Sequence, residues 1–224
     1  MSDPIVEYAP NIPDLLQWYH REHRPMPWRE TENPYYIWIS EIMLQQTRVD
    51  QALPYFERFI HAFPTVESLA RADQQEVLML WEGLGYYSRA RNIHKAAKQI
   101  LSECEGSLPP DYEALRSLPG IGPYTAAAIA SIAFKLEHAV MDGNVIRVVS
   151  RYIGLEEDTR KNATRSGIQK VVDEWIIGHP PDDFNQAIME LGATVCTPHK
   201  PACEHCPLSA QCVAFTQSKT ERIP

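Results

Sequence analysis

Short segments with helical periodicity recur along almost the whole chain, and this pattern limits the possible folds more than any other feature. Apolar residues return every three or four positions, whereas no run of alternating Val, Ile and Thr bounded by turn residues predicts a strand. Pro, Gly or Asn separates the predicted helices, which cover residues 12–22, 34–47, 49–63, 65–73, 75–84, 89–103, 111–118, 123–135, 144–155, 164–177 and 182–196. The sequence therefore predicts an all-α protein.

The bulk composition is that of an ordinary globular protein. The chain has 224 residues, 44% of them hydrophobic and 22% charged, which suits one large domain or two small ones. No run of eighteen apolar residues predicts a membrane span. Residues 1–14 are acidic and interrupted by prolines, unlike a secretion signal, so we expect a cytoplasmic protein.

The charge distribution bears on nucleic-acid binding. A net charge of −8 argues against DNA, because phosphates dominate the affinity of DNA-binding proteins. Basic residues nevertheless gather in segments 24–29, 88–98 and 147–152. One basic face on an acidic protein therefore remains compatible with DNA binding.

One carboxylate lies inside a predicted helix that is otherwise apolar. Ile37, Trp38, Ile42 and Leu44 spread around most of the helix circumference, and Glu41 lies among them. Glutamate is rarely buried without a partner, and apolar surroundings favour its protonated form. Glu41 is therefore a candidate acid, although a structural ion pair with an arginine is the alternative interpretation.

A second carboxylate precedes the helix predicted from residue 144. Either Asp142 or Asn144 could cap this helix, and a capping carboxylate stays charged. One protonated and one charged carboxyl group are the pair that cleavage of a glycosidic bond requires. The sequence does not by itself show that Glu41 and Asp142 meet.

A glycine-containing turn joins the predicted helices 111–118 and 123–135. Gly120 and Gly122 leave the backbone amides of this turn uncovered, and Pro123 stands at the first helical position. Amides at a helix N-terminus attract anions such as a DNA phosphate. A plain connection between two helices is an equally good interpretation of the turn.

Four of the five cysteines follow the pattern C-x6-C-x2-C-x5-C near the C-terminus. Four thiols within one short loop can bind zinc or an iron–sulfur cluster, and the single C-x2-C unit favours the cluster. Two disulfides are the structural alternative. The ligands of this predicted structural centre are Cys196, Cys203, Cys206 and Cys212, while Cys104 stands apart.

Taken together and in this order, these segments resemble the helix-hairpin-helix DNA glycosylases that carry a [4Fe–4S] cluster. Within that superfamily the chain is most similar to the adenine DNA glycosylases of the MutY type. The similarity lies in "SEIMLQQT", "WEGLGYYSRARNIHKAA", "LPGIG", "DGNVIRV" and "FNQAIMELGATVCTPHKPACEHCPL", and it extends from about Trp18 to Cys212.

The resemblance implies roles for the residues of the reaction. Glu41 matches the acid that protonates the flipped adenine at N7, and Asp142 matches the carboxylate that stabilises the resulting oxocarbenium-like sugar. Asn144 and Tyr124 match residues that support this pair. Because bifunctional relatives carry a lysine at the position of Tyr124, the resemblance implies a monofunctional glycosylase.

The resemblance also implies how DNA and the cluster are bound. The expected partner is double-stranded DNA with adenine opposite 8-oxoguanine or guanine. The matching positions are Trp28, Arg29 and Glu190 in the adenine pocket, Gln45 and Tyr86 as side chains inserted into the DNA stack, Gly120 and Gly122 in the hairpin, and Cys196, Cys203, Cys206 and Cys212 as ligands of the [4Fe–4S] cluster.

The implied architecture has two helical lobes with a DNA-binding cleft between them. Residues 26–137 are expected to form a six-helix barrel that includes the helix-hairpin-helix, and residues 1–25 and 138–224 the cluster lobe. Typical members continue into a MutT-like domain, which we expect this chain to lack. We expect a monomer in the cytoplasm, associated with the nucleoid when bound to DNA. A thymine or uracil mismatch glycosylase and a non-catalytic DNA-binding module are the alternative functions.

Overall fold

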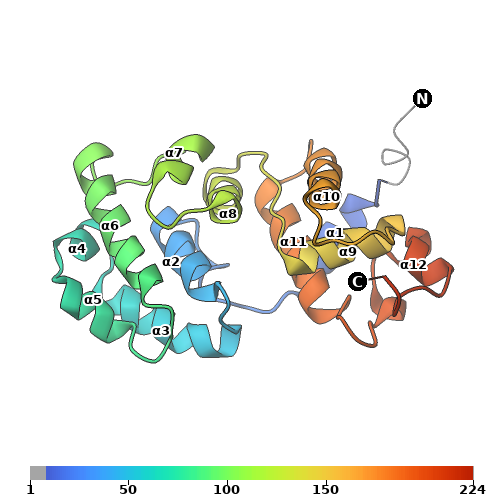
Figure 1. The fold of residues 1–224 in the computed structure, drawn as a ribbon, viewed down its shortest axis with the longest axis horizontal. Coiled ribbons are helices and arrows are strands. Elements are labelled where there is room, and N and C mark those ends of the chain that lie inside the picture. Colours follow the sequence, from blue (N-terminus) through green and yellow to red (C-terminus); the bar gives the residue numbers. More distant parts are fainter. Residues whose placement is uncertain (1–8, 224) are drawn as a thin grey trace. The chain divides into compact units, whose positions relative to one another are not determined.

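The computed structural model describes residues 9–223, and every regular element in this range is a helix (Figure 1). The prediction of an all-α fold is confirmed. No described helix is long and apolar enough to cross a membrane. The prediction that the chain starts without a secretion signal concerns residues 1–14, of which residues 1–8 lie outside the described residues.

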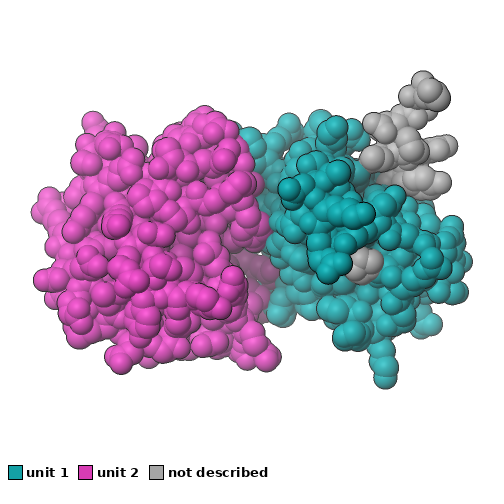
Figure 2. All heavy atoms as spheres, viewed as in Figure 1, with its two compact units in different colours: residues 1–24, 135–224 teal, residues 25–134 magenta. Residues whose placement is uncertain are grey.

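The chain divides into two compact units (Figure 2). Unit 1 combines residues 1–24 with residues 135–224, and unit 2 comprises residues 25–134. Unit 1 therefore joins the two ends of the chain, because α1 (Ile12–Glu22) packs against α11 (Pro181–Thr194) far along the sequence.

The helices of each unit lie close to the predicted positions. Unit 2 contains α2 (Pro34–Leu44), α3 (Val49–Ala62), α4 (Val66–Arg71), α5 (Gln74–Leu80), α6 (Ser88–Glu103), α7 (Tyr112–Ser117) and α8 (Pro123–Phe134). Besides α1 and α11, unit 1 contains α9 (Gly143–Ile153), α10 (Asn162–Trp175), the 3-10 helices η1 (Cys203–His205) and η2 (Ser209–Gln211), and α12 (Val213–Thr216).

The structure corrects several predicted boundaries. Helix α2 ends at Leu44 rather than residue 47, because Gln46 adopts a left-handed conformation with φ 55°. Helix α5 ends at Leu80 rather than residue 84, and Gly83 follows with φ 93°. The short helices η1, η2 and α12 were not predicted, because the prolines and cysteines of this region hide any helical period.

Helix α2 lies in the interior of unit 2, where it packs against α3 and α8. Trp38, Ile39 and Met43 on α2 are completely buried. The alanine-rich face of α8 allows close approach, and Ala126 and Ala128 are also completely buried. These contacts explain why α2 carries apolar residues all round rather than on one face.

Helices α9 and α11 form the centre of unit 1. A Cβ atom added at Gly192 on α11 would lie 2.6 Å from Cβ of Asn144 on α9, so the two helices touch at this point. Arg151 on α9 is only 2% exposed and donates hydrogen bonds to the carbonyl oxygens of Thr197, Pro198 and Ile223. The C-terminal segment is thereby held against α9.

Candidate functional site

Glu41 lies in unit 2, on the buried helix α2. It is 7% exposed, and Trp38, Ile42 and Met43 on the same helix are buried beside it in the sequence. The helix forms here because Asn33 caps its start and Pro34 occupies the first position. The prediction that Glu41 lies in a largely buried segment agrees with this burial.

Asp142 lies in unit 1 and caps helix α9. Its Oδ1 accepts a hydrogen bond of 2.8 Å from the amide of Val145, and its Oδ2 accepts one of 2.8 Å from Nδ2 of Asn144. Of the two capping residues that the sequence allowed, the structure has Asp142. Two donors thus fix the position of the carboxylate at the start of α9.

Arg147 connects this carboxylate to the cysteine loop, and sequence reasoning assigned it no role. Its Nη2 donates to Oδ1 of Asn144 at 2.8 Å, and its Nε donates to the carbonyl oxygen of Cys196 at 2.7 Å. Burial lowers the pKa of Arg147, while the neighbouring Cys196 raises it. A continuous line of hydrogen bonds therefore leads from Asp142 through Asn144 and Arg147 to Cys196. The basic segment 147–152 was the only sequence signal for Arg147.

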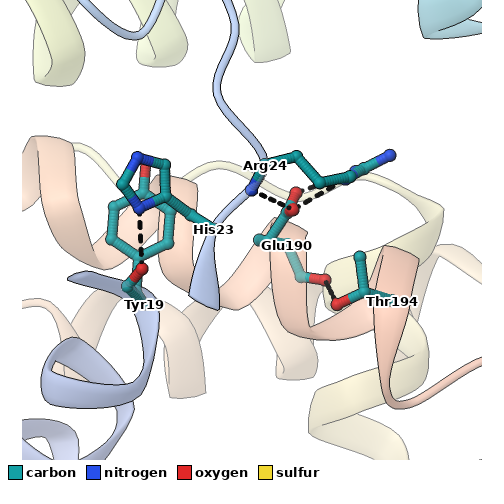
Figure 3. Close-up of polar contacts among 5 residues, drawn as sticks. All are labelled: Tyr19, His23, Arg24, Glu190 and Thr194. Atoms are coloured by element: carbon teal, nitrogen blue, oxygen red, sulfur yellow. Dashed lines mark hydrogen bonds and ion pairs between the residues drawn. The ribbon is translucent and has the colours of Figure 1, made fainter. Parts of the chain in front are cut away.

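Glu190 is clamped by Arg24, another residue that sequence reasoning did not single out (Figure 3). The Arg24 guanidinium donates from Nε to Oε1 at 2.7 Å and from Nη2 to Oε2 at 2.8 Å, and the Arg24 amide also donates to Oε1. The hydrogen bond to Glu190 raises the pKa of Arg24. Because the Glu190 side chain is 1% exposed, this two-pronged ion pair supplies the charge partner that a buried carboxylate requires.

The other residues predicted for an adenine pocket are Trp28 and Arg29. Both lie near the start of unit 2, a few residues after Arg24 in the sequence. Trp28 is 7% exposed and meets the ring of Phe56 edge to face at 5.2 Å. The amide of Arg29 donates to the carbonyl oxygen of Met26, which closes a turn. Trp28 is therefore fixed by core packing.

The residues predicted to enter the DNA stack lie on two loops of unit 2. Nε2 of Gln45 donates to Oγ1 of Thr125 on α8 at 3.2 Å. Tyr86 is 60% exposed and adopts a left-handed conformation with φ 51°. An exposed aromatic side chain on a constrained loop can stack on a nucleic-acid base. Tyr124, predicted to support catalysis, stands in the first turn of α8 and is partly exposed.

The turn between α7 and α8 has the form that the two glycines predict. Gly120 has φ 81°, a conformation that residues with a Cβ rarely adopt. A Cβ at this position would lie 2.7 Å from Cβ of Asn92, whereas a Cβ at Gly122 would meet nothing within 4 Å. Gly120 is therefore required by the fold, while Gly122 leaves open space at the start of α8.

Substitution of these two glycines should have unequal effects on stability. We expect Gly120→Ala to lower the free energy of unfolding by about 2 kcal/mol, through strain and the clash with Asn92. We expect Gly122→Ala to change it by no more than about 0.5 kcal/mol. Denaturant unfolding of both variants measures the difference, and equal losses would contradict this account of the turn.

The four cysteines of the C-terminal loop line one cavity in unit 1, together with Val148, Arg151 and Tyr152. Each is a free thiol, so the disulfide alternative does not describe this structure. Burial raises the pKa of the Cys206 thiol to about 12 and also raises the pKa of Cys203 and Cys212. Nη1 of Arg151 approaches Sγ of Cys196 at 3.5 Å. Half-buried thiols beside an arginine suit a ligand that supplies positive charge.

The arrangement of these sulfurs differs from that of a site for one metal ion. Among residues 9–223, no three or more Cys, His, Asp or Glu side chains are grouped so as to hold a single ion. The thiolates of a four-iron cluster bind four different iron atoms, so they surround a space rather than converge on one point. A shared cavity lined by four thiols is compatible with that requirement.

The fold is all-helical, and it contains a glycine hairpin, a buried glutamate and a loop with four cysteines. Together these features define the class of protein. Residues 39–174 match the family model described as HhH-GPD superfamily base excision DNA repair protein. The chain belongs to this superfamily. The matched range includes Glu41, the hairpin and Asp142, and it ends before the cysteine loop.

Curated relatives are identical to the chain at about two fifths of the aligned residues. It is 43% identical over 219 residues to an adenine DNA glycosylase of Rattus norvegicus, with 94% of this chain and 42% of the relative covered. An adenine DNA glycosylase of Buchnera aphidicola is 40% identical over 211 residues, covering 94% of this chain and 60% of the relative. The chain thus spans roughly two to three fifths of the length of these relatives.

Solved structures show the same fold. A structure described as a thermostable thymine-DNA glycosylase has a TM-score of 0.82 and 28% identity, and it covers 92% of this chain and 95% of its own. A trapped endonuclease III–DNA covalent intermediate has a TM-score of 0.77 at 21% identity, covering 97% and 99%, and it supports the fold alone.

Proposed function

We propose that this chain is a monofunctional adenine DNA glycosylase, which hydrolyses the N-glycosidic bond of adenine mispaired with 8-oxoguanine or guanine. Membership of a base excision repair superfamily supports the general class of activity. The names of the curated relatives support adenine as the base removed. We further propose that it acts on duplex DNA as a cytoplasmic monomer, at the nucleoid.

The observation that carries the proposal is the contrast between two carboxyl groups. Glu41 is buried on an apolar helix, which favours the protonated form of a carboxyl group. Asp142 is fixed at the start of α9 by the Val145 amide and the Asn144 side chain. A proton donor and a fixed anion are the two groups that this cleavage needs.

The proposed reaction begins when adenine leaves the duplex, because its glycosidic bond is inaccessible within the stack. Glu41 donates its proton to N7, and the bond between C1′ and N9 breaks with its electrons passing to the base. Asp142 stabilises the positive charge that develops on the sugar. A water molecule then forms the new bond to C1′ and gives one proton to Glu41, which leaves an abasic site and free adenine. With Tyr124 rather than a lysine beside the site, no Schiff base forms and the strand stays intact.

The remaining residues hold the parts of this site in place. Asn144 and Arg147 fix the Asp142 carboxylate. Arg24 fixes the Glu190 carboxylate, and we assign Glu190, Trp28 and Arg29 to adenine binding. Gln45 and Tyr86 enter the DNA stack, and the turn of Gly120 and Gly122, which is open at Gly122, receives a phosphate.

We propose that the four cysteines hold a [4Fe–4S] cluster. Four free thiols around one cavity, next to Arg151, fit this group in donor type and number. When bound, the cluster would cross-link the loop of residues 196–212 and would not supply a reacting group. Arg147 links that loop to Asn144, so an ordered loop also supports the position of Asp142.

Single-turnover cleavage of labelled duplexes tests the proposed function. The substrates carry adenine opposite 8-oxoguanine, adenine opposite guanine, and thymine opposite guanine, each measured with and without hot alkali. We expect breaks on the adenine strand only after alkali. Breaks without alkali would contradict a monofunctional enzyme, and DNA binding without any cleavage would favour a non-catalytic module.

A thymine glycosylase is the second candidate, because a structure of that description matches almost the whole chain. The substrate with thymine opposite guanine distinguishes the two candidates. Cleavage of that duplex alone would replace adenine by thymine as the base removed. The ratio of the two adenine rates measures how far this chain by itself distinguishes 8-oxoguanine from guanine.

Asp142→Asn should separate the charge of this residue from its capping role. Asparagine keeps an acceptor for the Val145 amide but loses the acceptor for Nδ2 of Asn144, so we expect the free energy of unfolding to fall by no more than about 1 kcal/mol. We expect the excision rate to fall about 10²–10³-fold, because the developing positive charge loses its anion. The matched control is Asp73→Asn, which alters the cap of α5 in the same way. A rate within about threefold of the parent would contradict the role of Asp142.

A further inference from the structure

A buried arginine without an assigned role joins two loops of unit 2. Arg89 lies in the first turn of α6 and is 8% exposed. Nη1 and Nη2 of its guanidinium, with four N–H groups between them, lie within hydrogen-bond distance of six acceptors in the last turn of α2, the loop that follows α2 and the loop that precedes α6. The acceptors are the carbonyl oxygens of Ile42 (2.9 Å), Met43 (3.0 Å), Gln45 (2.6 Å), Leu84 (3.3 Å) and Gly85 (3.3 Å), and the hydroxyl of Thr47 (3.2 Å).

The position of this cation is unfavourable for α6 and favourable for α2. A positive side chain at a helix N-terminus opposes the helix dipole, and burial lowers the pKa of Arg89. The carbonyl groups at the end of α2 have no partner within the helix, and they lie at the negative end of its dipole. Arg89 therefore stabilises the end of α2 and the loop beyond it at a cost to its own helix.

Both loops contain backbone conformations that need support. Gln46 has φ 55° and Tyr86 has φ 51°, and residues with a Cβ seldom adopt such values. Strained conformations persist where the surrounding structure fixes them, and they gather at functional sites. Here the same guanidinium binds the carbonyl oxygens of Gln45 and Gly85, each directly before one of the strained residues.

The two loops carry the side chains that we assign to insertion into DNA. Gln45 lies beside Thr125, to which its amide donates. The ring of Tyr86 lies 5.4 Å from Cζ of Arg89, within range of a cation–π contact, and the backbone amide of Arg89 donates to the Tyr86 carbonyl at 2.9 Å. Arg89 thus touches both loops directly and one of the two inserted side chains.

We propose that Arg89 is a positioning residue, which fixes the loops around Gln45 and Tyr86 so that both side chains enter the DNA stack as one rigid wedge. The inference rests on the proposed function and names the residue that prepares the enzyme for base extrusion. A wedge that is ordered before binding does not lose conformational entropy when it meets DNA. Lysine cannot replace Arg89, because a single ammonium group carries three donors and cannot span both loops.

The first experiment compares two substrates with the Arg89→Lys variant. One duplex carries adenine paired with guanine, and the other carries adenine opposite a tetrahydrofuran abasic analogue, where the stack is already interrupted. We expect the excision rate on the paired duplex to fall about 10–100-fold, since displacement of a positioning group by about 1 Å has effects of that size. On the second duplex we expect a change of at most about threefold. Equal losses on the two duplexes would show a merely structural role and overturn the proposal.

The second experiment asks whether Arg89 acts through Tyr86. If it does, adding Arg89→Lys to a Tyr86→Ala variant should lower the excision rate on the paired duplex by less than about twofold, because the wedge is already lost. Full additivity of the two effects would contradict the proposal. Hydrogen exchange adds a readout that is independent of activity, and we expect faster exchange in residues 45–48 and 83–87 of the single variant.

Two further variants keep the test decisive. Thr47→Val removes one of the six acceptors. It should lower the excision rate on the paired duplex and speed up hydrogen exchange in the two loops, even if Arg89→Lys does not fold. Arg71→Lys, at an exposed position paired with Glu67 on α4, controls for loss of a guanidinium and should resemble the parent. If the parent chain removes no adenine, the proposed function fails, and unchanged exchange in the two loops of Arg89→Lys then overturns the positioning role as well.

Discussion

Glu41→Gln is expected to reduce adenine excision about 10³-fold or more while DNA binding stays intact. The amide has nearly the shape of the acid but has no proton to donate to N7, and general acid catalysis contributes about 10²–10⁴-fold. Glu41 is 7% exposed, and glutamine keeps the size of the side chain and one acceptor oxygen, so we expect the variant to stay folded. Single-turnover rates on the adenine–guanine duplex, together with binding to the same duplex, measure the two effects separately.

The control for this prediction is Glu57→Gln, which makes the same change at an exposed position of α3. It should excise adenine at the rate of the parent. Unchanged excision by Glu41→Gln would refute the proposed acid. Loss of excision together with loss of the folded state would instead indicate that Glu41 has a structural ion-pair role.

Cys206→Ser is expected to abolish cluster binding and to destabilise unit 1. Serine is a poor ligand for iron, and the free energy of metal binding contributes directly to folding where a site forms only in the folded chain. We expect iron in the purified variant to fall from about four atoms per chain to near zero, with loss of the visible absorbance. The free energy of unfolding should also fall by several kcal/mol, as it does when other structural metal sites are lost.

Cys104→Ser is the matched control, because this cysteine lies in unit 2 and outside the cavity. It should keep its iron. One zinc ion per parent chain in place of iron would contradict the cluster, and full iron content in Cys206→Ser would contradict the ligand set. Without metal, burial raises the pKa of Cys206 to about 12, so cluster binding must release protons. The cluster should therefore be held more weakly as the pH falls.

The helices could be predicted from the sequence because their signals are local. Asn11 and Asp142 cap helices whose first turns they adjoin, and apolar periodicity marks the buried faces. The predicted ends of α2 and α5 failed where the chain turns into a left-handed conformation shortly after the helix. At Gln46 that conformation is stabilised by Arg89, which lies more than forty positions away in the sequence.

The sequence by itself determined the all-α class, the turn around Gly120 and the cysteine loop, and it limited the cap of α9 to Asp142 or Asn144, because each depends on residues close together in the chain. Only the tertiary structure decided which distant groups compensate the buried charges. The clamp of Arg24 on Glu190 joins residues 166 positions apart, and the contact of Arg147 with Cys196 joins residues 49 apart. Such pairs cannot be predicted from the periodicity of the sequence. A buried charge needs a partner nearby in space, and only the packing of the helices determines which residue that partner is.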